Sequence, residues 1–181
     1  MLHLKNITAG NPKTAEQYQM TKRHSIVWLF SEDGKNWYEE QKNFASDTIK
    51  VAYNERGRVV WVGKDVTGIE PTNVSIIELP DITTNRRITA PGFWFYRNDE
   101  FVFDYKLKAE DERNALLQQA SSMTSEWEKD LLLGLISDED REKLKAYRIY
   151  AKSLQAMDFN IITDKTSYNA IEWPVSPEAS S

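Results

Sequence analysis

The sequence FWFYRNDEFVFDYKLKAEDERNALLQQASSMTSEWEKDL, at residues 93–131, changes its pattern partway along and divides the chain into two parts. Residues 93–96 and 101–103 are aromatic runs on either side of the turn sequence RNDE, which predicts a β-hairpin. After Tyr105, apolar residues recur at every third or fourth position, as on one face of a helix. We therefore expect an α+β fold, with a β-rich domain over residues 1–105 and helices after it.

Upstream of this stretch, the chain repeats the pattern of short strands and turns. The strand candidates are rich in β-branched and aromatic residues and predict a mostly antiparallel domain. His3 is expected to lie at a frayed terminus. Besides the hairpin already quoted, we expect a hairpin between residues 25–30 and 37–38, a second between 49–53 and 59–62, and a strand at 74–79 that ends at Pro80.

The second part of the chain predicts two helices over residues 106–157 that form an antiparallel hairpin. The carboxylates at 110–112 are expected to mark the start of the first helix. Gly134 can end that helix in a left-handed conformation, and Ser137 can cap the second one. Residues 158–181 lose the helical spacing, and we expect them to form an irregular tail.

Each predicted helix has one apolar stripe, and a lone hairpin covers both stripes incompletely. The stripes must therefore pack on the rest of this chain or on another chain. Because the first helix is long for so small a domain, we favour another chain and expect a homo-oligomer. The residues assigned to self-association are Leu116, Met123, Trp127, Leu131, Leu144, Tyr147 and Leu154.

Composition argues against several classes of function. The chain has no Cys and only two His, which gives neither the spacing of metal ligands nor a nucleophile with a histidine partner. We therefore expect no enzyme activity, no catalytic residue, no metal and no cofactor. A formal charge of −5 without a basic stripe argues against nucleic-acid binding. The absence of a run of about 20 apolar residues argues against membrane insertion.

The β-rich part holds more aromatic side chains than a domain of its size needs for a core. They can be core residues, an exposed patch that binds a partner protein, or a platform on which sugar rings stack. Trp and Tyr concentrate at the energetic centres of protein interfaces. On the second interpretation, the partner-binding residues are Trp28, Trp37, Tyr38, Trp94 and Tyr96.

Short stretches along nearly the whole chain carry a family pattern: GNPKT (10–14), EQY (16–18), IVWLFSEDG (26–34), NWYE (36–39), DTIKVAY (47–53), NRR (85–87), GFW (92–94) and IEWP (171–174). Together they resemble the tail-fibre assembly proteins of Mu-like and lambdoid phages and of prophages in enteric bacteria. The part through Tyr38 is the most specific. Residues 158–170 depart from the pattern, because many relatives are shorter there.

The resemblance implies a non-enzymatic chaperone that binds the C-terminal region of the trimeric tail-fibre protein and promotes its folding and trimerisation. It implies action in the host bacterial cytoplasm during phage assembly, with the option of remaining at the fibre tip on the virion. The alternative is a carbohydrate-binding module that contacts host surface glycans, namely lipopolysaccharide. An enzyme of unknown type is a third hypothesis, which the failed motif searches disfavour.

Overall fold

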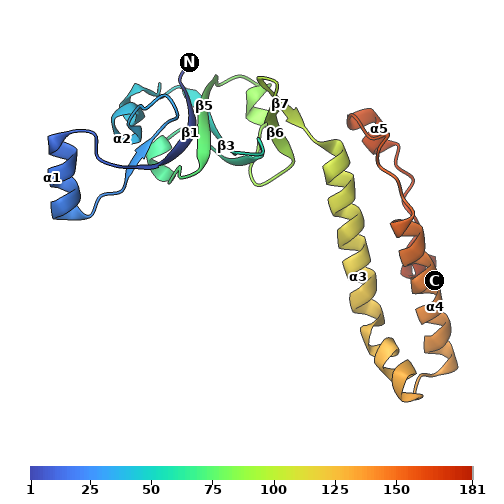
Figure 1. Cartoon of the computed structure of the whole chain (residues 1–181). Coiled ribbons are helices and arrows are strands. Elements are labelled where there is room, and N and C mark those ends of the chain that lie inside the picture. The colour runs from blue at the N-terminus through green and yellow to red at the C-terminus, as the bar shows by residue number, and fades with distance from the viewer. Residues whose placement is uncertain (181) are drawn as a thin grey trace. The chain divides into compact units, whose positions relative to one another are not determined.

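The computed structural model describes residues 1–180, which divide after Phe103 into two units (Figure 1). The first unit, Met1–Phe103, contains the strands, and the second, which begins at Asp104, contains the long helices. The expected α+β class, with an antiparallel β-rich part before the helices, is confirmed.

A five-stranded antiparallel sheet with the order β2-β1-β5-β3-β4 forms the centre of the first unit. Strand β3 pairs on both sides, with β4 and β5, and most of its side chains are buried on both faces of the sheet. The predicted β3–β4 hairpin and the predicted strand β5 are confirmed. The strands are β1 (His3–Gly10), β2 (Trp28–Phe30), β3 (Thr48–Asn54), β4 (Val59–Gly63) and β5 (Val74–Pro80).

The hairpin predicted in the quoted stretch is also confirmed, as β6 (Trp94–Arg97) paired with β7 (Glu100–Phe103). Trp94 and Phe101 of this hairpin pack against the buried core cluster that contains Val51 of β3. Short helices connect the strands of this unit: α1 (Ala15–His24), α2 (Trp37–Glu40), η1 (Gln41–Asn43), η2 (Val66–Gly68) and η3 (Asn85–Arg87).

The sequence pattern does not predict strand β1, and the expectation that His3 lies at a frayed terminus is wrong. Leu4 and Ile7 are both fully buried although they lie three positions apart. The register shifts between them, where Asn6 has a φ of 46°. This irregularity breaks the two-residue alternation by which a strand is recognised in a sequence.

The expected hairpin between residues 25–30 and 37–38 is reduced to one antiparallel bridge, between Phe30 and Asn36, and the predicted returning strand at 37–38 is wrong. Strand β2 pairs with β1, and residues 37–38 begin the short helix α2. The side chain of Asn36 accepts a hydrogen bond from the backbone N–H of Tyr38 at 2.9 Å. Asn at such a cap favours the start of a helix, so the aromatic pair that looks like a returning strand forms a helical turn.

The second unit is an antiparallel helical hairpin with a C-terminal segment packed on it (Figure 1). Gly134 ends α3 with a φ of 70°, and Ser137 caps α4, as predicted. Helix α3 begins before the predicted carboxylates, because the side chain of Asp104 caps it. No helix among residues 1–180 is long and apolar enough to cross a membrane. The helices are α3 (Tyr105–Leu133), α4 (Asp138–Gln155), α5 (Lys165–Asn169) and η4 (Pro177–Ser180).

The C-terminal segment is more ordered than the expected irregular tail. Phe159 and Ile162 are buried with Ala109 of α3, and Trp173 packs against both this cluster and the hairpin's own core. Its ring centroid lies 5.7 Å from that of Phe159. The C-terminal segment thus covers apolar surface that the sequence pattern leaves without a partner, so part of each stripe packs within this chain.

Trp173→Ala is expected to lower the free energy of unfolding by about 2 kcal/mol, because it removes a half-buried ring that joins two core clusters. Chemical denaturation followed by circular dichroism measures this loss. The exposed neighbour Val175 provides a matched control, and Val175→Ala is expected to leave the unfolding midpoint unchanged. Equal stability of the two variants would contradict this role for the C-terminal segment.

Candidate interaction surfaces

Four aromatic side chains from four strands meet at one place in the first unit, and we call them the tyrosine cluster. They are His3 of β1, Tyr53 of β3, Tyr96 of β6 and Phe101 of β7. The rings of Tyr53 and Tyr96 stack with centroids 4.6 Å apart and an interplanar angle of 28°. The ring centroid of Phe101 lies 5.0 Å from that of Tyr96. The ring of His3 meets that of Tyr96 edge-on, with centroids 5.6 Å apart. The cluster therefore joins the small hairpin to the main sheet.

Gly57, in the turn between β3 and β4, brings Tyr96 into the cluster. The backbone N–H of Tyr96 donates a hydrogen bond of 2.7 Å to the carbonyl oxygen of Gly57. A Cβ atom at position 57 would lie only 2.3 Å from the carbonyl oxygen of Tyr96, and the φ of Gly57 is +78°. Only glycine fits both conditions, so the turn residue sets how closely the β6–β7 hairpin approaches the sheet.

The titratable groups of the tyrosine cluster, which are the hydroxyls of Tyr53 and Tyr96 and the imidazole of His3, favour their uncharged forms near pH 7. Burial raises the pKa of Tyr96 to about 12, and the hydrogen bond to Asp99 acts in the same direction. Burial also raises the pKa of Tyr53, whose hydroxyl lies 2.7 Å from Nε2 of His3. Burial, with the nearby charge of Lys5, lowers the pKa of His3. Neutral hydroxyls beside ring faces suit hydrogen bonding and stacking, and they are poor nucleophiles.

The five residues predicted to bind a partner fall into two groups. Trp94 and Tyr96 are half-buried on β6, and Tyr96 belongs to the tyrosine cluster. Trp28 and Tyr38 meet edge-on at 5.8 Å, and Tyr38 is 45% exposed. Among the described residues, no ring contact joins the two groups.

Two of these five residues lie inside the unit, where a protein docking on its surface does not reach them. Trp37 is 1% exposed and belongs to the core cluster around Leu4 and Ile7. Trp28 is also buried, and its indole N–H donates a 2.7 Å hydrogen bond to Oγ1 of Thr21. Aromatic content alone does not separate core rings from surface rings, so Tyr38, Trp94 and Tyr96 remain as the accessible candidates.

The residues assigned to self-association also divide by burial. Leu144, Tyr147 and Leu154 are buried within the second unit, where they hold α4 against α3 and the C-terminal segment. Leu116 and Trp127 are half-buried in the same region. The remaining assigned residues, Met123 and Leu131, are exposed towards the free end of the hairpin.

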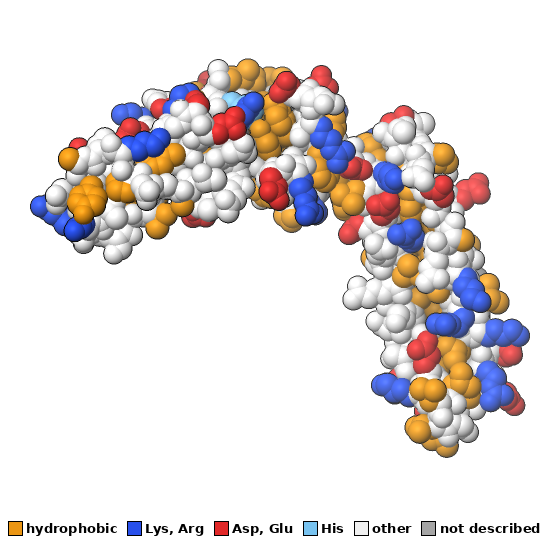
Figure 2. Space-filling view, in the orientation of Figure 1, with side chains coloured by type: hydrophobic (Ala, Val, Ile, Leu, Met, Phe, Trp, Pro, Cys, Tyr) orange, Lys and Arg blue, Asp and Glu red, His pale blue; other side chains and the backbone are white. Residues whose placement is uncertain are grey.

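The free end of the hairpin carries apolar side chains that no described part of the chain covers. Leu132, Leu133 and Leu135 are 87%, 70% and 72% exposed, and they surround the helix end at Gly134. Figure 2 shows hydrophobic side chains gathered at this end. Helical spacing places Leu131 on the apolar stripe of α3 but not its neighbours Leu132 and Leu133. The run Leu131–Leu133 beside this turn indicates an exposed apolar surface, because Leu132 and Leu133 lie outside both helix stripes.

Titratable side chains do not gather into a chemical site. Within residues 1–180, no three His, Cys, Asp or Glu side chains come together as metal ligands would. His24 is exposed at the end of α1 and is not a member of the tyrosine cluster.

Comparison with known proteins agrees with an assembly protein of tailed phages. Residues 39–178 match the family model described as "Caudovirales tail fibre assembly protein, lambda gpK". The chain belongs to the tail fibre assembly family.

Similar proteins within this family come from phages of Escherichia. The chain is 44% identical to the tail fiber assembly protein U' of Escherichia phage Mu, with 98% of this chain and 100% of the relative covered. The protein of the same name from Escherichia phage P1 is also 44% identical, with the same coverage. A probable tail fiber assembly protein of Escherichia phage P2 is 38% identical, again over 98% and 100% of the two chains.

Gly57→Ala is expected to destabilise the first unit by at least about 2 kcal/mol, because the added Cβ meets the carbonyl oxygen of Tyr96 and φ is positive. Thermal unfolding, read from tryptophan fluorescence, measures the change. Gly68→Ala is the matched control, since a Cβ there has open space and φ is not in the left-handed range. If Gly57→Ala unfolds at the temperature of the control, the close approach of the hairpin is not a constraint.

Proposed function

We propose that this protein is a non-enzymatic chaperone that binds the C-terminal region of the trimeric tail-fibre protein and promotes its folding and trimerisation. Membership of the tail fibre assembly family supports a role in tail-fibre assembly. Fibre chains must come into register before their long-range contacts form, and their unpaired edges aggregate in the meantime. A protein that holds those surfaces lowers the cost of bringing the chains together.

The observation that carries the proposal is the pair of exposed apolar surfaces, one on each unit. The first unit offers Tyr38 and the half-buried rings of β6, and we assign the fibre contact to this unit. The second unit offers the exposed leucines at the free end of the hairpin, and we assign self-association to it. Both surfaces are apolar with polar rims, which is typical of protein interfaces.

Co-expression with the tail-fibre protein of the same phage tests the proposal. We expect soluble, SDS-resistant fibre trimer to depend on this protein, which acts in the host cytoplasm during assembly. Co-purification then tells whether the protein stays on the fibre tip or is released. Equal yields of trimer with and without it would contradict the chaperone function.

Alanine substitution of the accessible aromatic residues tests where the fibre binds. Tyr38→Ala and Tyr96→Ala are expected to weaken fibre binding about tenfold or more, as truncation of an interface anchor does. Tyr18, which is exposed on α1, provides a matched control, and Tyr18→Ala is expected to bind as well as the native chain.

Binding is measured by titration calorimetry on variants whose urea midpoint shows that they are folded. If both Tyr38→Ala and Tyr96→Ala bind like the control, the fibre contact does not lie on this surface.

A second candidate function is the binding of host surface glycans such as lipopolysaccharide. The observation that favours it is the half-buried ring of Tyr96, with the Asp99 carboxylate 3.1 Å from its hydroxyl. Ring faces beside hydrogen-bonding groups are the elements from which sugar sites are built. Retention of the purified chain on immobilised lipopolysaccharide, lost in Asp99→Ala, would support this role. The two functions are compatible if the protein stays on the virion.

A further inference from the structure

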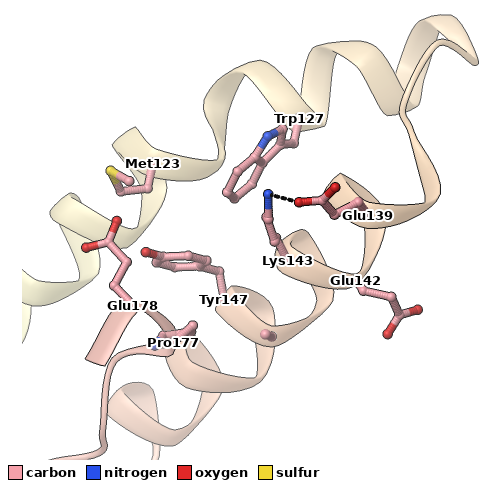
Figure 3. A pocket seen from close by; sticks show the side chains of 9 residues that line it. Met123, Trp127, Glu139, Glu142, Lys143, Tyr147, Pro177 and Glu178 are labelled. Carbon is pink, nitrogen blue, oxygen red and sulfur yellow. Dashed lines mark ion pairs between the residues drawn. The ribbon is translucent and has the colours of Figure 1, made fainter. Parts of the chain in front are cut away.

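Two grooves flank the free half of the α3–α4 hairpin, with volumes of about 590 Å³ and 530 Å³. The first, the acidic groove, is drawn in Figure 3, and its defining residues are Met123, Trp127, Glu139, Glu142, Lys143 and Glu178. The second, the basic groove, is defined by Glu128, Leu131, Leu132, Arg141, Lys145 and Arg148.

The helical repeat of α4 places the two grooves on opposite sides of the hairpin. Successive residues of a helix are rotated by about 100°. Glu139 and Glu142 therefore form one row of charges, and Arg141, Lys145 and Arg148 form another. The buried stripe that holds α4 against α3 runs between the two rows. A partner can occupy one groove without touching the other.

The grooves carry opposite net charge. Three carboxylates and one ammonium line the acidic groove, and two guanidinium groups, one ammonium and one carboxylate line the basic groove. Several of these charges are paired within the chain: Lys143 with Glu139 at 2.6 Å, and Glu128 with Arg148 at 3.8 Å. Arg141 also pairs with Asp138 at 3.5 Å, and Lys145 pairs with Glu142 of the acidic groove at 3.6 Å. These are pairs between exposed side chains, which contribute little and can exchange partners.

The apolar parts of the two grooves are complementary as well. Leu131 and Leu132 stand out from the basic groove, and both are exposed. The acidic groove is hollow between Met123 and Trp127 of α3 and the face of α4 (Figure 3). Protruding leucines on one groove and an aromatic-lined hollow in the other are the two halves of one apolar contact.

We propose that the basic groove of one copy of this chain docks into the acidic groove of the next copy. This inference rests on the proposed self-association of the hairpin and specifies its geometry. Leu131 and Leu132 enter the hollow beside Trp127, and Arg141 and Lys145 face Glu139 and Glu142. The occupant of each groove is thus a second copy of the same chain.

A symmetric pairing of identical faces is disfavoured, because it would set three cations against three cations, or three carboxylates against three carboxylates. The contact is therefore heterologous: each copy uses one face to hold its neighbour and offers the other face to the next. Such a contact is not limited to two copies. It builds a ring when the rotation closes and an open chain when it does not.

Charge reversal in the full-length chain tests the geometry. One variant carries Arg141→Glu, Lys145→Glu and Arg148→Glu, and the other carries Glu139→Lys and Glu142→Lys. Each variant alone then has two faces of the same sign, so we expect at least a tenfold loss of self-association in sedimentation velocity. An equimolar mixture restores opposite faces at every contact, and we expect it to associate again. This recovery also demonstrates that both variants are folded.

Matched leucine and isoleucine changes test the apolar part. Leu132→Ser is expected to weaken self-association, whereas Ile149→Ser is expected to have no effect. Ile149 is 60% exposed on the same hairpin and lines neither groove. Raising the salt to 1 M, where the screening length is about 3 Å, is expected to weaken the native association.

Three outcomes would overturn the heterologous contact. Native-like association of either charge-reversed variant alone would do so, and so would failure of the mixture to associate. A native chain that stays monomeric at high concentration would overturn self-association itself. That last result would leave the chaperone function standing, because dependence of fibre trimer on this protein is measured separately in the co-expression experiment.

Discussion

A hairpin of two helices has too little surface to bury both of its apolar stripes, and this constraint shapes the whole second unit. Other segments of the chain cover these stripes along only one half of the hairpin. The C-terminal segment folds back with Phe159, Ile162 and Trp173 and closes the apolar surface near the start of α3. Nothing in the described chain covers the other half, where Leu131–Leu133 and Leu135 are exposed. The same hairpin is thus a folded core at one end and exposes apolar side chains at the other.

In the first unit, the two-stranded β6–β7 hairpin depends on contacts with the main sheet, because an isolated hairpin of two strands is only marginally stable. The β6–β7 hairpin is fixed to the sheet by the backbone approach at Gly57 and by the stacked rings of Tyr53 and Tyr96. The aromatic side chains therefore have two tasks. Packing of the rings stabilises the unit, while Tyr38 stays exposed and Trp94 and Tyr96 stay partly exposed.

Elements with regular periodicity could be predicted from the sequence. The β3–β4 and β6–β7 hairpins, strand β5, the left-handed end at Gly134 and the cap at Ser137 all follow from local patterns. The failures have physical causes that local patterns do not contain. A bulge at Asn6 disguised β1, and a cap at Asn36 turned an aromatic pair into a helix.

The candidate surfaces were harder to predict than the fold. Trp28 and Trp37 have the same residue type as an interface anchor, and only long-range packing shows that they are buried. The tyrosine cluster joins residues from positions 3 to 101, which no spacing rule connects. The exposed leucines, by contrast, were visible as a run at a turn.

We propose that the first unit binds the fibre and that the second unit binds other copies of this chain. Hydrogen–deuterium exchange of the protein, free and bound to its fibre at equal chain concentration, tests this division directly. We predict that fibre binding slows exchange of backbone amides in β6, β7 and α2, while the amides around Gly134 change only with the concentration of this protein. Protection confined to the α3–α4 hairpin in the fibre complex would contradict it.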